Sequence, residues 1–416
     1  MSQPKPETRA PSRKLVRITA AILAAAFLGF VFAASAVMVT GHWQELNDAV
    51  RRMTSLQPYL PERWNRLDLL QARISSVTSC ISGIMWLKDD LGYVNSGFQY
   101  ALGKRMINTG SQNMITLTDG RLYDLCDYKP LQKNTDDIAA LREGALAGLP
   151  FLFVYEHPTL YRQDMLPAGY EALDHSAQMA DEAVTALRES GIDVLDSRDV
   201  LMNCGRGLDD LLLVTDQHWS TLAAITMAQA IADKINGMTG AALDPSLLDL
   251  KNLNTLVHEK LFMGKYGQRV GPGVVDPDDI IEYWPKYDTE ITRDTLQTTS
   301  EEHVTGPFRE AVTRFDRLEP DPGRTWNTLA YTYYGQVETY NNFHNDAAPD
   351  FTILLLKDSY SAPIGTFMSL LARDVITVDL RRDVDPLETW ITKYRPDAVV
   401  MAYSLQMLRD DDYAFN

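Results

Sequence analysis

The sequence predicts an α/β fold in which a parallel sheet is flanked by helices. Short continuous apolar runs alternate along the chain with segments of helical apolar periodicity. Runs that lack a polar residue at every second position are typical of strands buried on both faces, as in a parallel sheet. The rhythm stops near residue 237 and resumes near residue 351. We therefore expect one sheet domain with a long insertion over 237–350.

The elements of this sheet domain can be assigned in chain order. The expected strands are the apolar runs 149–155, 192–195, 211–214, 351–356, 375–378 and 398–402. The expected helices lie at about 170–190, 222–235, 363–372 and 386–394. Gly191 stands where a helix C-terminal glycine belongs, and Pro363 suits the first turn of a helix. Strands and helices thus alternate on both sides of the insertion.

The insertion is polar and rich in turn residues, yet it contains many aromatic side chains. A segment this long inside a compact domain is expected to be functional or to have structure of its own. Most of its aromatic residues are expected in the core, with stacking of one or two on a sugar ring as the alternative. These residues are Tyr283, Trp284, Tyr287, Trp326, Tyr331, Tyr333, Tyr334 and Tyr340.

The N-terminus predicts a membrane anchor. Residues 1–17 form a basic leader, and residues 18–39 form an apolar run without a charged residue. About 20 such residues span the hydrocarbon core, and basic flanks stay cytoplasmic. Residues 40–84 are then a membrane-proximal helical stalk, and residues 85–416 an extracytoplasmic domain. A cleaved secretory signal is the alternative, because Ala34-Ser35-Ala36 fits a small-residue cleavage site.

Composition excludes several classes of partner. The 416-residue chain has a formal net charge of −17, which argues against nucleic acid as a partner. Its cysteines, Cys80, Cys126 and Cys204, lack zinc-ligand spacing, and a Cys80–Cys126 disulfide is one option in an oxidising compartment. Nothing in the sequence indicates a cofactor, and no further ligand cluster accompanies Asp216 and His218, so we expect no metal.

Two apolar runs end in residues that could carry out nucleophilic chemistry. Asp216 and His218 follow the run 211–214, and Ser359 follows the run 351–356. In an open parallel sheet, ligands bind outside the carboxyl ends of the strands. Ser359 is then a candidate nucleophile, His218 its general base and Asp216 the group that orients the imidazole. The structural alternative for Ser359 is a helix cap.

Both segments resemble a known family. Thr215-Asp216-Gln217-His218-Trp219 resembles the Asp-His-His-Trp signature of the DHHW family, within the SGNH-hydrolase-like domain of alginate O-acetyltransferases. Lys357-Asp358-Ser359-Tyr360-Ser361 resembles the block that carries the nucleophilic serine, and Tyr333-Tyr334-Gly335 resembles a further element. The resemblance covers roughly residues 85–405. It implies a permuted SGNH-hydrolase-like fold, because the Asp-His block precedes the Ser block.

Residue by residue, the resemblance implies the same roles for Ser359, His218 and Asp216. It also implies that Trp219 is a packing residue that shapes the site. Gln217 departs from the signature, in which a histidine occupies this position, but that histidine is not the general base. The oxyanion-hole residues of the family cannot be placed, and Asn341, Asn342 and Gly335 are only candidates.

The resemblance and the expected anchor together imply an activity. We expect a serine-dependent O-acetyltransferase, bound to the cell membrane by a single span, that acts on a cell-surface or wall polysaccharide. A membrane partner would supply the acetyl donor. A carbohydrate acetylesterase would use the same three residues with water as acceptor. A non-catalytic factor that binds glycan or a partner is the alternative from another class.

Overall fold

The computed structural model describes residues 88–110, 112–157, 160–297, 300–335, 338–382 and 385–409. Nearly all of them belong to a compact unit, Gly92–Asn416. The predicted leader (1–17), anchor (18–39) and stalk (40–84) lie outside the described residues. Within the described ranges, no helix is both long and apolar enough to cross a membrane. The anchor therefore stays a prediction.

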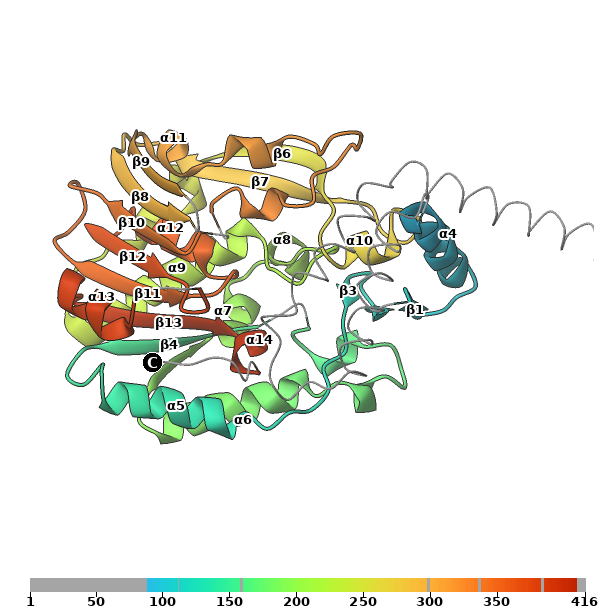
Figure 1. Cartoon of the computed structure of the whole chain (residues 1–416), viewed down its shortest axis with the longest axis horizontal. Helices are drawn as coiled ribbons and strands as arrows, with labels where there is room; N and C mark the ends of the chain where they lie inside the picture. The colour runs from blue at the N-terminus through green and yellow to red at the C-terminus, as the bar shows by residue number, and fades with distance from the viewer. Residues whose placement is uncertain are drawn as a thin grey trace, which may run out of the picture. The chain divides into compact units, whose positions relative to one another are not determined.

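A mixed eight-stranded sheet lies at the centre of this unit (Figure 1). Its strands are β4 (Phe151–Glu156), β5 (Asp193–Asp196), β8 (Ile291–Gln297), β9 (Ser300–Gly306), β10 (Tyr340–His344), β11 (Thr352–Lys357), β12 (Asp374–Val378) and β13 (Ala398–Ser404). They are ordered β5-β4-β13-β11-β12-β10-β8-β9. From β5 to β12 each neighbouring pair is parallel, whereas β10, β8 and β9 pair antiparallel.

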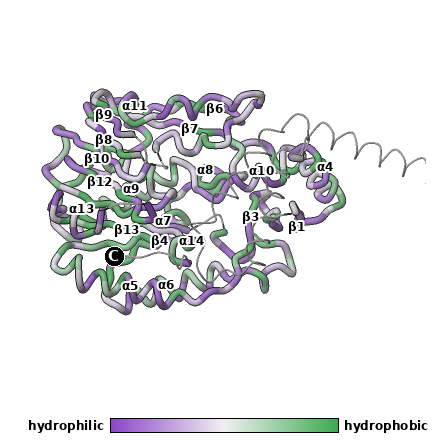
Figure 2. Tube along the Cα trace, viewed as in Figure 1, coloured by the Kyte–Doolittle hydropathy of each residue, from purple (hydrophilic) through white to green (hydrophobic). Residues whose placement is uncertain are grey.

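Helices cover both faces of the sheet. One face carries α7 (Ser197–Asn203), α9 (Thr221–Thr239) and α12 (Ala362–Met368), and the other carries α5 (Gln132–Glu143), α6 (Ser176–Glu189), α13 (Leu387–Tyr394) and α14 (Leu405–Leu408). Successive residues of a strand point to opposite faces of the sheet. Leu152 and Val154 pack in the core on the first face, and Phe151 and Phe153 pack in the core on the second. Hydrophobic residues accordingly gather where β4, β13 and α9 lie (Figure 2).

The predicted α/β class is confirmed, and most expected elements are present. The helix expected at 170–190 is α6, which begins only at Ser176 because Glu171–Leu173 forms a separate 3₁₀ turn. Gly191 has φ +74°, so a glycine is needed just beyond this helix. The expectation of a wholly parallel sheet is wrong. The insertion supplies β8, β9 and β10, and successive hairpin-like strands pair antiparallel.

The strand expected at 211–214 is also wrong. Residues Leu208–Leu211 form the short helix α8, and Leu212 makes only an isolated bridge to Trp219. Leu211, Leu212 and Leu213 are apolar because they are buried in the core beneath α9. A short apolar run cannot distinguish a strand from another buried segment.

The remaining elements lie beside the sheet. A small sheet follows the helix α4 (Lys88–Ala101) and contains β1 (Met106–Asn108), β2 (Asn113–Thr116) and β3 (Leu122–Tyr123). Within the insertion, β6 (Leu253–Phe262) and β7 (Asp278–Pro285) form an antiparallel pair, accompanied by α10 (Gly267–Val270) and α11 (Phe308–Val312). Cys126 and Cys204 are free thiols in the described part of the chain. The Cys80–Cys126 disulfide stays a prediction, because Cys80 lies outside the described residues.

Candidate active site

Ser359 lies at the carboxyl end of β11, between this strand and α12. The side chain of Asp358 holds the turn: Oδ1 accepts from the Tyr360 amide at 2.8 Å, and Oδ2 accepts from the Ser404 amide at 3.0 Å. Ser361 Oγ donates to the carbonyl of Ala402 at 3.0 Å. Because Ala402 and Ser404 belong to β13, the turn is fixed to the neighbouring strand. Ser359 itself is half-buried.

A second carboxyl group lies behind this turn. Glu156 ends β4 and is fully buried, and its Oε2 lies 3.3 Å from Ser361 Oγ. Burial raises the pKa of Glu156 well above its usual range, and the charge of the neighbouring Asp358 raises it further. Both causes act in the same direction, because burial and a neighbouring carboxylate each disfavour the charged form of Glu156.

Asp216 and His218 lie on an irregular loop between α8 and α9. The loop is held by β7, because Asp278 Oδ1 accepts from the Val214 amide at 2.7 Å and Oδ2 from the Thr215 amide at 2.8 Å. It is also held by the segment before α10, where the Lys265 amide donates to Asp216 Oδ2 at 2.6 Å. The insertion thus replaces the sheet as the support of these residues.

The structure brings the three predicted residues together. His218 Nε2 lies 2.9 Å from Ser359 Oγ, and His218 Nδ1 lies 2.5 Å from Asp216 Oδ1. Burial alone would raise the pKa of Asp216, but His218 and the amides of His218 and Lys265 together hold it below its usual range. An ionised Asp216 only accepts hydrogen bonds, so it fixes the proton on Nδ1 and leaves Nε2 free to accept from Ser359.

Two tyrosines enclose the imidazole. The Tyr331 ring stacks on His218 at 4.3 Å between centroids and 23° between planes, and the Tyr360 ring lies at 4.4 Å on a tilt of 41°. Burial raises the pKa of Tyr331 beyond its usual range, so its hydroxyl stays protonated. Trp219 donates from Nε1 to the Tyr360 carbonyl at 3.1 Å and packs edge-on against the Tyr360 ring, which agrees with the packing role expected of it.

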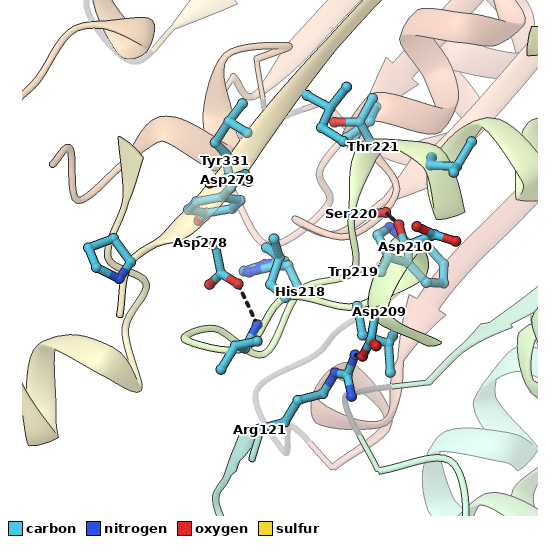
Figure 3. A pocket seen from close by; sticks show the side chains of 18 of the residues that line it. Arg121, Asp209, Asp210, His218, Trp219, Ser220, Thr221, Asp278, Asp279 and Tyr331 are labelled. Carbon is cyan, nitrogen blue, oxygen red and sulfur yellow. Dashed lines mark hydrogen bonds and ion pairs between the residues drawn. The ribbon is translucent and has the colours of Figure 1, made fainter. Parts of the chain in front are cut away.

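A cavity of about 450 Å³ opens onto Ser359 and His218 (Figure 3). Tyr331, Tyr360 and Trp219 line it beside them, and Tyr283 of β7 contributes a further ring. The charged residues that line it are mainly acidic: Asp209, Asp210, Asp278 and Asp279. Two basic residues, Arg121 and Lys260, line it as well. Arg121 donates to Asp209 at 2.7 Å. The volume and the mixture of rings and polar groups suit a small polar ligand such as a sugar.

Several residues of the site were not predicted from the sequence. Tyr331 was expected to be one of many core aromatics, and Asp278 and Lys265 were not singled out, because only the fold brings them beside Asp216. Conversely, Asn341, Asn342 and Gly335 do not line the cavity at Ser359. Asn341 lies within β10, where its Oδ1 accepts from Thr295 Oγ1 at 2.7 Å. These three are therefore not supported as oxyanion-hole residues.

Comparison with known proteins gives a match for part of the chain. Residues 152–301 match the family model described as the SGNH hydrolase-like domain of acetyltransferase AlgX. The resemblance predicted from the sequence is confirmed. The match contains Asp216 and His218 but ends before Ser359, so the serine block rests on the sequence resemblance and on the geometry. Among curated proteins, none matches this chain.

Solved structures share the fold at low identity. A DHHW family protein from Eubacterium siraeum is 16% identical, with a TM-score of 0.56 over 74% of this chain and 95% of that chain. PatB1 from Bacillus cereus is 16% identical, with a TM-score of 0.58 over 73% of this chain and 100% of that chain. PatB1 is also known with a sulfonyl adduct. The chain thus has an α/β, SGNH-like fold that is shared over nearly the whole length of these proteins.

Proposed function

We propose that this protein is a serine-dependent O-acetyltransferase that modifies a cell-surface or wall polysaccharide outside the cytoplasm. The observation that carries the proposal is the hydrogen-bonded series Asp216–His218–Ser359, open to a cavity large enough for a sugar unit. The match to an acetyltransferase domain and the predicted membrane anchor support the reaction class and the location.

The geometry supports a two-step acyl transfer. Ser359 Oγ attacks the acetyl carbonyl of the donor while its proton passes to His218 Nε2, and His218 returns that proton to the departing donor group. An acetyl ester on Ser359 remains. A sugar hydroxyl then attacks this ester, His218 Nε2 takes the hydroxyl proton, and Ser359 recovers it as the acetyl group leaves. The buried Asp216 carboxylate stabilises the imidazolium formed in each step.

Reaction with a sulfonyl fluoride tests the nucleophile directly. PatB1, which shares the fold, has been obtained with a sulfonyl adduct, and the half-buried Ser359 beside a base should react in the same way. We expect phenylmethylsulfonyl fluoride to add one sulfonyl group, located on Ser359 by peptide mass spectrometry. Ser361 is the matched control, because it is buried and hydrogen-bonded to Ala402. An adduct that persists in Ser359→Ala, with none on Ser359 in the parent protein, would refute the assignment.

Turnover tests the reaction. We expect hydrolysis of 4-nitrophenyl acetate, a transient acetyl-Ser359, and loss of both in Ser359→Ala. Adding polysaccharide acceptors should divert acetyl groups onto sugar hydroxyls. Acetyl transfer only to water, whatever acceptor is offered, would make the protein an esterase. Absence of both turnover and acetyl-serine would leave binding of glycan or partner as its function and refute the enzymatic proposal.

A further inference from the structure

A second cavity, of about 290 Å³, adjoins the candidate active site. Tyr360 lines both cavities, whereas Ser359 and His218 line only the first. Gln217, the residue that departs from the family signature, lines the second. Three cationic side chains, Lys265, Arg269 and Arg409, also line it, with Gln112, Gln406 and Ser404 as further polar groups.

The charges in this second cavity do not balance. Among the described residues that line it, one carboxylate stands against the three cations: Asp124, whose pKa is raised by burial and pulled down by the charges of Arg269, Lys265 and Arg409. All three cations are thus close enough to act on the same point. The Cys126 thiol also lines the cavity, and burial raises its pKa to about 11, so it stays neutral at pH 7. A basic cavity is unexpected in a chain of net charge −17.

The hydrogen bonds of these cations leave capacity for a ligand. Arg269 Nη1 lies 3.5 Å from Asp124 Oδ2, which is long for a charge-assisted bond. Arg409 Nη2 donates to the Asp127 carbonyl, but its buried Nε has no partner among the described residues. Lys265 is exposed, so its ammonium can turn toward a ligand. A buried donor without an acceptor is destabilising, and an anion here would supply the missing acceptor.

We infer that this second cavity is an oxyanion site that takes a carboxylate or phosphate group. Guanidinium groups match the geometry of both anions, and amide side chains such as Gln217 add neutral donors. The volume suits one small charged group rather than an extended polymer. The inference does not depend on acyl transfer, because it rests on the charges and donors of Lys265, Arg269 and Arg409.

Two residues that line the second cavity also form hydrogen bonds with residues of the candidate active site. The Lys265 amide donates to Asp216 Oδ2, and the Ser404 amide donates to Asp358 Oδ2. A ligand in the second cavity would therefore contact Lys265 and Ser404, whose amides hold the carboxylates of Asp216 and Asp358.

Titration calorimetry in the Ser359→Ala background tests the inference without turnover. Inorganic phosphate and glucuronate serve as probes at constant ionic strength, each replacing chloride. We expect one molecule of at least one probe to bind per chain, with affinity about tenfold lower in Lys265→Gln and in Arg269→Gln, as removal of one charge-assisted bond predicts. Lys251→Gln, an exposed lysine outside the cavity, is the matched control and should bind normally.

Each outcome has a definite meaning. Binding of phosphate alone identifies a phosphate ligand, and binding of glucuronate alone identifies a carboxylate on a sugar. Failure of both probes to bind overturns the inference, as does an equal loss of affinity in Lys251→Gln. Arg269 packs on the Tyr266 ring, so Arg269→Gln can lose stability as well as affinity. Lys265 is exposed, so Lys265→Gln should fold normally and report on binding alone. Because Ser359 is absent throughout, the result is independent of the acetyltransferase proposal.

Discussion

The two halves of the candidate site are supported in different ways. Ser359 follows a central parallel strand, and the Asp358 side chain fixes its turn to β13. Asp216 and His218 lie on the loop between α8 and α9 and do not follow a strand of the main sheet. Their loop is held by a carboxylate of β7 and by an amide before α10, both contributed by the insertion.

The difference shows which parts of the site tolerate change. The Ser359 half depends on packing of the sheet, so damage there should cost stability and activity together. The Asp216–His218 half depends on a few polar contacts, so damage there should displace the base while most of the core remains intact. The variants below test this contrast, from the largest expected effect to the smallest.

Removing the base should have the largest effect. We expect His218→Ala to lower kcat/KM for 4-nitrophenyl acetate by about 10²–10⁴-fold, the usual contribution of a positioned acid–base group. Steady-state kinetics at several pH values would measure it. A loss of less than about tenfold would show that Ser359 does not depend on His218 and would end the triad interpretation.

A methyl group at Gly264 should break the Asp216 loop. A Cβ there would lie 2.4 Å from Asp216 Cβ and 2.7 Å from the Thr215 carbonyl oxygen, so the loop must move. A shift of about 1 Å at a catalytic group can cost about 10²-fold in rate, and we expect Gly264→Ala to lower kcat by roughly that factor. The measurements are kcat and the free energy of unfolding from urea titration.

Gly365→Ala is the matched variant on the Ser359 side. A Cβ at Gly365 would lie 2.5 Å from Thr377 Cγ2, between α12 and the sheet. We expect it to lower the free energy of unfolding by about 1–3 kcal/mol, the usual cost of overpacking, with a smaller loss of kcat than in Gly264→Ala. For each variant, the loss of kcat is compared with the loss of free energy of unfolding. If this ratio is larger for Gly365→Ala than for Gly264→Ala, the contrast between the two halves is wrong.

Asp278, which holds the Asp216 loop, should make the free energy of unfolding depend on pH. Burial raises the pKa of Asp278 to about 6, although its bonds from Thr215 and Val214 act in the opposite direction. An unfolded Asp titrates near about 3.9, so between about pH 4 and 6 the folded state binds more protons than the unfolded state. Asp278 therefore contributes a decrease in the free energy of unfolding as pH rises through this range.

Asp278→Asn should remove that contribution. As pH rises from 4 to 7 the variant should gain stability relative to the parent protein, against a pH-independent cost of about 1–3 kcal/mol for the acceptor that its amide nitrogen removes. Urea unfolding at pH 4, 5, 6 and 7 of both proteins would measure the difference. The same slope with pH in both proteins would show that Asp278 does not titrate in this range.

Restoring the family signature should have the smallest effect. Gln217 lines the second cavity and not the one at Ser359, so we expect Gln217→His to change kcat by no more than about twofold, or about 0.5 kcal/mol. Kinetics with 4-nitrophenyl acetate would check this. A large gain in rate would instead show that Gln217 weakens the site.

Much of the fold and the three central site residues could be predicted from the sequence. The runs that became β4, β11, β12 and β13 are apolar at successive positions because both faces of each strand are covered, and that pattern is visible in the residues alone. Ser359 was found because it follows such a strand, and His218 because it stands two residues after Asp216.

Tertiary structure decided the rest. The run 211–214 is as apolar as a strand, but it is buried in the core beside α9 and joins no strand of the sheet. The antiparallel edge of β8, β9 and β10 could not be predicted, because pairing depends on contacts between strands that local sequence does not specify.

The sequence by itself determined which residues could serve as acid, base and nucleophile, because these roles depend on side-chain chemistry and local spacing. Only the tertiary structure decided that Asp278, Lys265 and Tyr331 surround them and that three cations converge beside Gln217. These groups come from segments far apart in the chain, and their proximity follows from long-range packing that no local pattern encodes.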